Sequence, residues 1–467
     1  MCAHAIGQDG SAGQSSDMSP SSDSDQQQKG ADEQGPPYWK FPPLVGFNFP
    51  TPPVPGSENR SFILPGAEFN AGVNATEPDG FGKVRSYGTA RALGSLSLQR
   101  LWKRYDLGLD YIGGVAYLGS RREGHSLLQS LDADQHVSWS TGQLGFRNSF
   151  TYLPEGNFGA GAYGGSSALS ALGTGGGGLI GLGIFSPAQF ASLGEEPRIT
   201  NVSLASITQY FSPRNSLFAA GSYGFVHFTN GSYQLVNSQQ VVAEAAFSRQ
   251  LTRKNQISFL YGHQMFRFPS LPETSGPPTG TNRNIQTDLV NVLFEHRIGE
   301  RMEFVGGAGP QFTNIQSPDS GTTKHVTASG RANVKYRLRT MELFAGFSRY
   351  NTNGSGLFGG ATTNIVRVSA SRTFRRVWLG SFDAGYSRNT ALIDFFGNHA
   401  SRYQYTYIGG GLHRQLTREL TGFLSYQFGN LNFNNDFCLT ATSCGRSSQR
   451  EVALIGLDWH RRPIPLD

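Results

Sequence analysis

The sequence predicts an all-β fold, a transmembrane antiparallel up-and-down β-barrel, from three observations. Long segments alternate apolar and polar residues with a period of two, which is typical of strands with two different faces. These segments recur in hairpins joined by short basic turns that lie roughly 40 residues apart. The chain is also poor in core-building residues, because only 37% of its 467 residues are hydrophobic while 60 are Gly.

The segment 325–347 shows the alternation most clearly. Every second residue is apolar or small, and the residues between them are polar or cationic. The parity reverses at Arg339-Thr340, so a two-residue turn there keeps one continuous apolar face across both strands. On the other face the same register places Arg337 opposite Glu342 as an expected ion pair. We expect the apolar face to meet lipid and the charged face to line a wet lumen.

The number of strands follows from the number of turns. The hairpin pattern recurs at 98–114, 247–264, 294–309, 334–350, 370–388 and 412–429, and more loosely at 207–225 and near Gly142. About eight tight turns predict about sixteen strands. A final strand at 451–460 needs a partner, which 68–75 can supply, so we expect about 18 strands, with 16 as the alternative. Strands of soluble sheets average only about five or six residues, so the longer ones here favour a membrane barrel.

Residues 1–60 differ in composition from the rest of the chain, and the barrel is expected to occupy 61–467. Ala3-His4-Ala5 looks like the end of a signal peptide, although no basic and apolar segments precede it, and we expect the mature protein to begin at Ile6. The stretch that follows is rich in Ser, Gln, Asp and Pro and cannot bury enough surface to fold. It predicts a disordered periplasmic arm.

Several function classes are not expected from the sequence. The net charge of +6 comes from scattered basic residues, so nucleic acid is not an expected partner. The Gly-rich run after Gly173 lacks the Gly-Lys-Ser/Thr of a phosphate loop, and no histidine lies at ligand spacing near the cysteines. Neither a Gly-x-Ser-x-Gly motif nor closely spaced paired carboxylates appear. We therefore expect no enzyme, no cofactor and no metal.

Cys438 and Cys444 enclose a short polar segment, "CLTATSC". Their spacing and an envelope setting predict a loop disulfide, with two free thiols as the alternative.

Through its alternation, short basic turns, long opposite loops and aromatic strand ends, the region 68–460 resembles Gram-negative outer-membrane β-barrel proteins of the porin-like kind. The resemblance implies an outer-membrane location, a lipid bilayer around the barrel, and a channel for passive diffusion of small hydrophilic solutes. It leaves open a homo-oligomer such as a trimer. Such proteins usually finish on an aromatic residue, whereas here Trp459 is followed by eight further residues.

The longest loop, 154–198, is the third long loop by position. In general porins the third loop folds into the barrel and narrows the pore, so the resemblance implies a constriction here; the alternative is a surface loop. The candidate constriction residues are Phe185, Gln189, Phe190, Glu195 and Glu196.

Strand parity alone selects the candidate pore-lining residues, which are Arg147, Arg331, Lys335, Arg337, Glu342 and Arg367. An excess of cationic side chains in a lumen would favour anions. The alternative is that these cations pair with inner carboxylates and brace the wall, and the candidates for such pairing are Asp110, Glu244, Glu342 and Asp383.

Two other functions stay open at this stage. The barrel could serve an envelope machine such as polysaccharide export, or act as an anchor that binds a periplasmic partner through its N-terminal arm. The third hypothesis is an outer-membrane enzyme. A secreted soluble β-protein is a further alternative fold.

Overall fold

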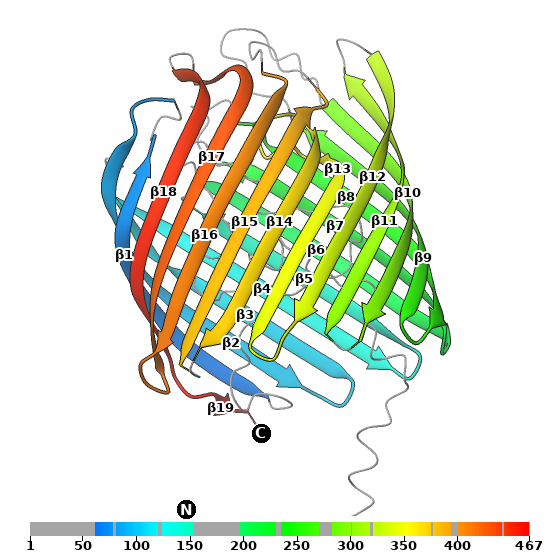
Figure 1. The fold of residues 1–467 in the computed structure, drawn as a ribbon, viewed down its shortest axis with the longest axis horizontal. Coiled ribbons are helices and arrows are strands. Elements are labelled where there is room, and N and C mark those ends of the chain that lie inside the picture. The colour runs from blue at the N-terminus through cyan, green and yellow to red at the C-terminus, as the bar shows by residue number, and fades with distance from the viewer. Residues whose placement is uncertain are drawn as a thin grey trace, which may run out of the picture. The chain divides into compact units, whose positions relative to one another are not determined.

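The computed structural model describes residues 61–77, 81–119, 124–153, 197–229, 235–269, 283–299, 301–317, 321–374, 377–393, 400–440 and 443–466. Within these residues, 18 long antiparallel strands form one closed barrel (Figure 1). Each strand pairs with its neighbours in sequence, and β1 closes the ring by pairing with β18. The prediction of an all-β barrel of about 18 strands is confirmed, while the predicted arm lies outside the described residues.

The strands are long and follow one another in simple order. They are β1 (Phe62–Thr76), β2 (Arg85–Leu101), β3 (Tyr105–Leu118), β4 (His125–Trp139), β5 (Gly142–Leu153), β6 (Arg198–Ser212), β7 (Asn215–Phe228), β8 (Ser238–Thr252), β9 (Asn255–Phe268), β10 (Arg283–Ile298), β11 (Met302–Ser317), β12 (Gly321–Arg337), β13 (Met341–Thr352), β14 (Ala361–Phe374), β15 (Trp378–Ala391), β16 (Arg402–Gln415), β17 (Leu420–Thr440), β18 (Ser443–His460) and the short β19 (Ile464–Pro465). Among the described residues, no helix has the length and apolar character needed to cross a membrane.

The alternation of the sequence becomes the two faces of the barrel wall. On β8, buried and exposed residues alternate from Ser238 to Arg249, with the exposed Phe247 between two buried residues. Large apolar side chains are exposed on the outer face all round the barrel, for example Val73, Leu127, Phe259, Val292, Val368, Leu424 and Ile455. A surface of this kind is expected to face lipid rather than water.

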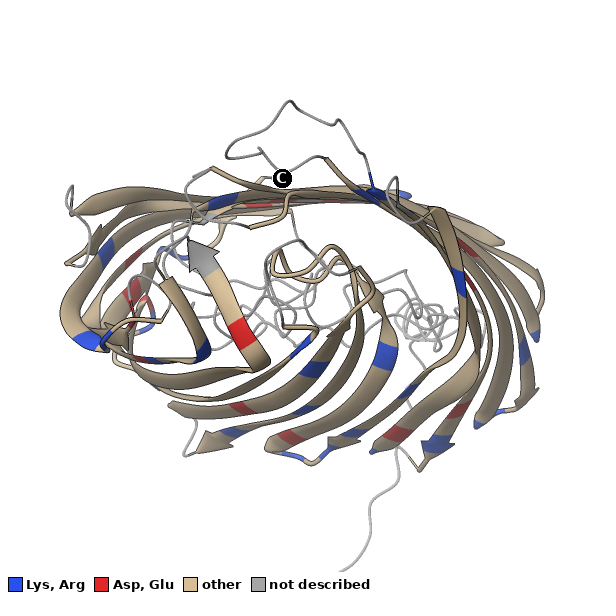
Figure 2. Ribbon diagram, turned by 90° about the horizontal axis from the view of Figure 1, so that it is seen from above, with Lys and Arg blue, Asp and Glu red and all other residues tan. Residues whose placement is uncertain are grey.

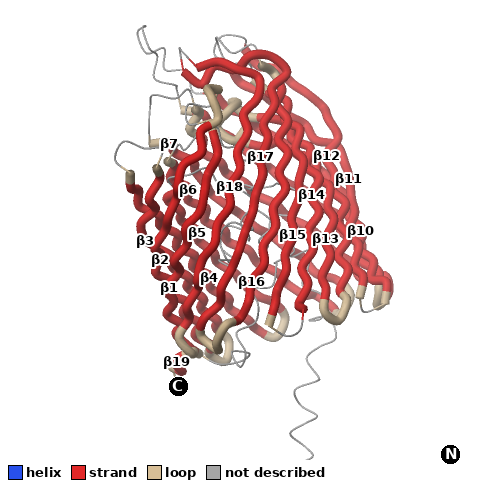
Figure 3. The backbone as a smooth tube through the Cα atoms, turned by 60° about the vertical axis from the view of Figure 1, so that its left-hand side comes forward, coloured by secondary structure: helices blue, strands red, loops and turns tan. Residues whose placement is uncertain are grey.

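The tight turns lie at one end of the tilted barrel, which we call the turn side, and the longer connections lie at the opposite loop side (Figures 1 and 3). Three of the turns begin with a hydroxyl that accepts hydrogen bonds from the backbone two and three residues further on. These hydroxyls belong to Ser212, Thr252 and Thr417. Such side-chain caps stabilise tight turns by satisfying backbone N–H groups that have no partner in the strands.

The turn between β12 and β13 has the register that parity predicts. Leu338 N donates a hydrogen bond to Met341 O at 2.7 Å, and Arg337 lies directly opposite Glu342. The two-residue turn at Arg339-Thr340 is therefore confirmed.

Strands β12 and β13 separate toward the loop side. Their pairing ends at Gly330 and Arg349, although β12 continues along β11 as far as Gly321. The end of β13 turns into the barrel instead, where Asn351 Nδ2 donates to Thr313 Oγ1 of β11 at 2.8 Å. The barrel wall is thus split above Gly330.

Replacing Ile455 with Arg tests the assignment of the outer face. Ile455 is 65% exposed and lies within the apolar belt of β18. We expect the substitution to lower the free energy of unfolding by about 2–4 kcal/mol in lipid vesicles, the cost of a cation near the bilayer midplane. Equilibrium denaturant titration measures the change, with Ser447→Arg at the loop side of the same strand as a control. Equal effects of the two variants would contradict a lipid-facing belt.

Candidate functional site: the barrel lumen

The six predicted pore-lining residues all lie at strand positions that face the lumen. Arg147 is on β5, Arg331, Lys335 and Arg337 are on β12, and Glu342 and Arg367 are on β13 and β14. Lys335 and Arg367 are buried, and Arg337 is exposed at the turn side. Contact of these residues with a solute stays a prediction.

Two of the lumenal cations form ion pairs with neighbouring carboxylates. Lys335 Nζ lies 2.5 Å from Glu342 Oε1. Arg367 contacts Asp383 Oδ2 through Nη2 at 2.7 Å and through Nε at 2.8 Å. The geometry of Lys335 and Arg367 therefore fits the alternative in which inner cations pair with carboxylates and brace the wall.

The expected ion pair between Arg337 and Glu342 is wrong, although the register that suggested it is right. Glu342 pairs with Lys335 instead. The Lys335 ammonium is buried and needs a counterion in the low-dielectric wall, whereas the exposed Arg337 guanidinium is solvated by water.

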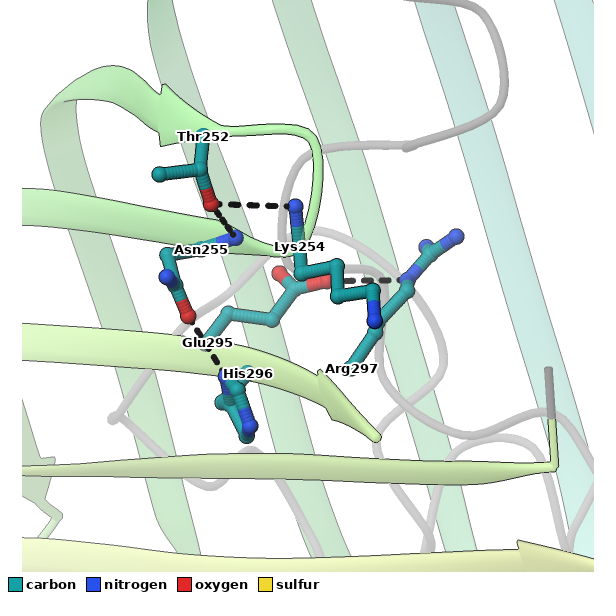
Figure 4. Close-up of polar contacts among 6 residues, drawn as sticks. All are labelled: Thr252, Lys254, Asn255, Glu295, His296 and Arg297. Atoms are coloured by element: carbon teal, nitrogen blue, oxygen red, sulfur yellow. Dashed lines mark hydrogen bonds and ion pairs between the residues drawn. The ribbon is translucent and has the colours of Figure 1, made fainter. Parts of the chain in front are cut away.

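A second charged group lies on the lumenal faces of β8, β10 and β12. Arg331 lies within electrostatic reach of Glu244 and Glu295. Glu295 Oε1 is also 3.6 Å from Arg297 Nε, beside the β8–β9 turn (Figure 4). The opposite charges of this group compensate one another across three strands.

The inner wall at β3 and β4 is acidic, which the sequence analysis largely missed. The lumen-facing carboxylates are Asp106, Asp110, Asp132 and Asp134. Asp110 lies directly opposite Asp132, and Asp134 lies opposite Arg147 on β5. Asp134 Oδ1 is 3.1 Å from His136 Nε2. Strand parity along 125–139 would have revealed this wall.

Figure 2 looks along the barrel and shows acidic and basic positions on the same ring of strands.

The connection between β13 and β14 folds into the barrel at the loop side. All residues of this connection, 353–360, are buried. Asn353 Nδ2 donates to Ser238 Oγ of β8 at 3.0 Å, and Val236 N donates to Gly356 O at 2.8 Å. The connection therefore reaches from β13 and β14 to the chain at the start of β8, and we call it the inner loop.

Glycine is required at two positions of the inner loop. Gly356 has a φ of 78°, and a Cβ there would lie 2.4 Å from Cζ of Phe228. Gly360 has a φ of 92°, and its Cβ would lie 2.4 Å from Cδ1 of Ile285. A larger residue would be strained at both positions and would collide with the side chains against which the loop packs.

An aromatic cluster fixes the inner loop within the loop-side end of the barrel. The ring centroid of Phe358 lies 5.1 Å from that of Tyr403 on β16 and 6.4 Å from that of Phe437 on β17. Phe433 and Phe437 stack at 4.6 Å. The same cluster includes Val226 and Phe228 from β7. It joins strands from widely separated parts of the sequence.

The inner wall is not polar throughout. On β7 to β11 a cluster of buried lumen-facing side chains is apolar, and its members are Phe218, Ala220, Val242, Ala246, Leu260, Leu289, Leu293 and Val305. The prediction of a charged, wet inner face was therefore incomplete for these strands. Strand β9 shows why, because Phe259, Leu260 and Tyr261 are consecutive, and alternation alone does not reveal its lumenal face.

The structure has a disulfide between Cys438 and Cys444, whose Cα atoms are 4.0 Å apart, at the loop-side ends of β17 and β18. The candidate constriction residues Phe185, Gln189, Phe190, Glu195 and Glu196 lie outside the described residues. Among the residues that are described, no group of His, Cys, Asp and Glu could hold a metal ion.

Replacing Glu342 with Gln should lower the free energy of unfolding by about 2 kcal/mol, because it removes the Glu342 carboxylate from its ion pair with the buried Lys335 ammonium. Denaturant titration in lipid vesicles measures the loss. Glu419→Gln is the matched control, because its pair with Arg462 is exposed and should contribute less than about 1 kcal/mol. The double variant K335Q/E342Q should recover part of the loss. A similar loss of stability in E342Q and E419Q would show that the Lys335–Glu342 pair does not brace the wall.

Replacing Gly356 with Val should release the inner loop. The positive φ and the collision with Phe228 predict at least about tenfold faster protease cleavage within 353–360, which corresponds to about 1.4 kcal/mol of strain. Limited proteolysis followed by mass spectrometry measures the rate. Gly82→Val is the control, because nothing lies within 4 Å of a Cβ at Gly82. Unchanged cleavage in G356V would show that the loop tolerates a side chain there.

Comparison with known proteins gives a likeness of fold without a family. No protein-family model matches the chain, and no curated protein does. The ferric-catecholate import receptor Fiu of E. coli K12 is 9% identical, with 85% of this chain and 81% of that chain covered and a TM-score of 0.39.

The outer membrane protein OpdK of Pseudomonas aeruginosa is 10% identical, with 85% and 99% covered and a TM-score of 0.40. The FrpB iron transporter of Neisseria meningitidis is 7% identical, with 86% and 83% covered and a TM-score of 0.40. These low sequence identities and TM-scores do not show a common family. The closed barrel and its apolar outer face give the chain the architecture of a Gram-negative outer-membrane β-barrel protein.

Proposed function

We propose that the chain forms an outer-membrane channel for passive diffusion of small hydrophilic solutes. The observation that carries this proposal is the chemistry of the lumenal face, where charged side chains line a closed barrel of 18 strands. A barrel of this strand number is wide enough to hold an aqueous path. Charged groups on its inner face are favourable where water or a counterion solvates them.

The inner loop is our first candidate for the element that narrows the channel. It is buried, it is tied by hydrogen bonds to Ser238 and Val236, and it packs in the aromatic cluster at the loop side. A rigid constriction of this kind would select solutes by size and shape. The loop 154–198 stays a second candidate for the same role.

The charge preference depends on which inner groups lack a compensating partner. Lys335 and Arg367 are neutralised by Glu342 and Asp383, which reduces the support for anion preference. On β3 and β4 four carboxylates face the lumen, and they outnumber the Arg147 and His136 side chains beside them. We therefore propose a channel with weak cation preference rather than the anion preference expected from the arginines alone.

Planar-bilayer recording of the refolded protein under a salt gradient tests the channel and its charge preference together. We expect stepwise conductance with a reversal potential biased toward cations. D132N/D134N should move the reversal potential toward anions, because it removes two lumenal carboxylates. E451Q is the control, because Glu451 is exposed on the outer face. An anion-biased wild type would overturn the charge assignment and leave the channel intact.

Shortening the inner loop tests the constriction. Replacing residues 354–359 with two glycines should raise the single-channel conductance, since it removes the packed segment from the loop-side end. Gly82→Val serves again as a loop control that should leave conductance unchanged. A verified folded barrel that shows no conductance steps would overturn the channel proposal and favour an anchor or a component of an envelope machine.

A further inference from the structure

The outer face of the barrel carries an apolar groove of about 930 Å³. It crosses seven strands, from β15 and β16 through β17, β18 and β1 to β2 and β3. Its lining includes two rows of register partners. One row is Leu412, Leu424, Ile455, Ala71, Ala90 and Tyr117, and the other is Arg414, Gly422, Leu457, Phe69, Ala92 and Val115.

The shape of the groove follows from residue size along these two rows. The bottom of the groove is formed by residues with little or no side chain, which are Ala71, Ala90, Ala92 and Gly422. Larger outward side chains, among them Ile455, form its sides. The result is a trough on the face that meets lipid, which suits an extended hydrocarbon chain.

The length and direction of the trough match one leaflet of a bilayer. From β16 to β3 the row crosses five gaps between strands, about 24 Å at the usual spacing. Because barrel strands tilt by about 40°, a row at right angles to them rises about 15 Å over this length. Half of a hydrocarbon core about 30 Å thick is also about 15 Å.

Cations lie at the turn-side end of the trough. The guanidinium of Arg414 lies 5.1 Å from the ring centroid of Trp378, and that of Arg372 lies 4.9 Å from the ring centroid of Phe374. Phe374, Trp378 and Arg414 are register partners on β14, β15 and β16. Within the described part of the chain, neither arginine forms an ion pair with an acidic side chain. Glu419 in the adjacent turn is paired with Arg462.

We propose that this groove binds one anionic phospholipid of the turn-side leaflet. One of its two acyl chains lies in the trough, and the headgroup phosphate is held by Arg414 and Arg372 at the membrane interface. Arginine binds phosphate through paired N–H donors, and aromatic rings at the interface hold the guanidinium in place. Lipid surrounds this face of the barrel, so the occupant is present wherever the barrel is inserted. The assignment is independent of conduction.

The test is native mass spectrometry of the intact protein refolded in phosphatidylcholine nanodiscs that contain a minor fraction of phosphatidylglycerol. We expect one phosphatidylglycerol retained per barrel. R372Q/R414Q should reduce its enrichment over phosphatidylcholine by about 30-fold, from about 1 kcal/mol for each cation at an anionic surface. Arg388→Gln, an exposed arginine at the opposite end of β15, is the control and should change nothing.

A second pair of variants tests the trough itself. Ala90→Phe should fill the floor and abolish lipid retention, whereas Ala345→Phe places the same ring on exposed outer β13 and should not. Equal retention of phosphatidylglycerol by A90F and A345F would overturn the proposal. Equal retention by R372Q/R414Q and the wild type would do the same. Displacement of the bound lipid by inorganic phosphate alone would also overturn the proposal. A wild-type dimer that the A90F substitution dissociates would overturn it as well, since the groove would then hold a second copy of the chain.

Discussion

Closure of the sheet between β1 and β18 is the constraint on which the rest of the structure depends. In lipid no water is present to satisfy the backbone, so an open sheet edge at membrane depth is excluded. The seam runs from Gly66 opposite His460 to Thr76 opposite Arg450. Arg450 Nε also donates to Asn74 Oδ1 at 3.1 Å across 376 residues of sequence. The barrel therefore depends on contacts between the two ends of its strand order.

Closure also decides what the inner side chains must do. Because the outer face meets lipid, most polar residues in the middle of the strands are directed inward, and each buried charge there needs a partner or water. Lys335 with Glu342 and Arg367 with Asp383 meet this requirement within the wall. Neutral amides and hydroxyls do so across strands, as Asn351 does with Thr313. The inner face is thus a bracing layer as well as a lining.

Sequence reasoning succeeded where the information is local. A period of two is set by neighbouring residues, so parity predicted the strands, the turn at Arg339-Thr340 and the lumenal side of Arg331 and Arg367. It failed where the outcome depends on distant segments. The packing of the inner loop depends on Phe228 and Tyr403, which lie far from it in sequence. No local pattern in 353–360 indicates these partners.

The apolar part of the inner wall is a second feature that the local sequence pattern did not predict. Leu289 and Leu293 occupy lumenal positions that a water-filled barrel would give to polar residues. The partner choice of Glu342 likewise depended on burial rather than on register. Burial is a property of the assembled barrel, and the sequence of one hairpin does not contain it.

The split above Gly330 has a consequence for the dynamics of the wall. Below it, β12 is held on both sides, whereas from Ser329 to Gly321 its regular pairing is with β11 alone. Backbone amides along a one-sided strand open to solvent at a lower free energy than those of a strand held on both sides. Hydrogen exchange should therefore begin on β12 at this tip, making the β11–β12 hairpin the place where the barrel starts to fray.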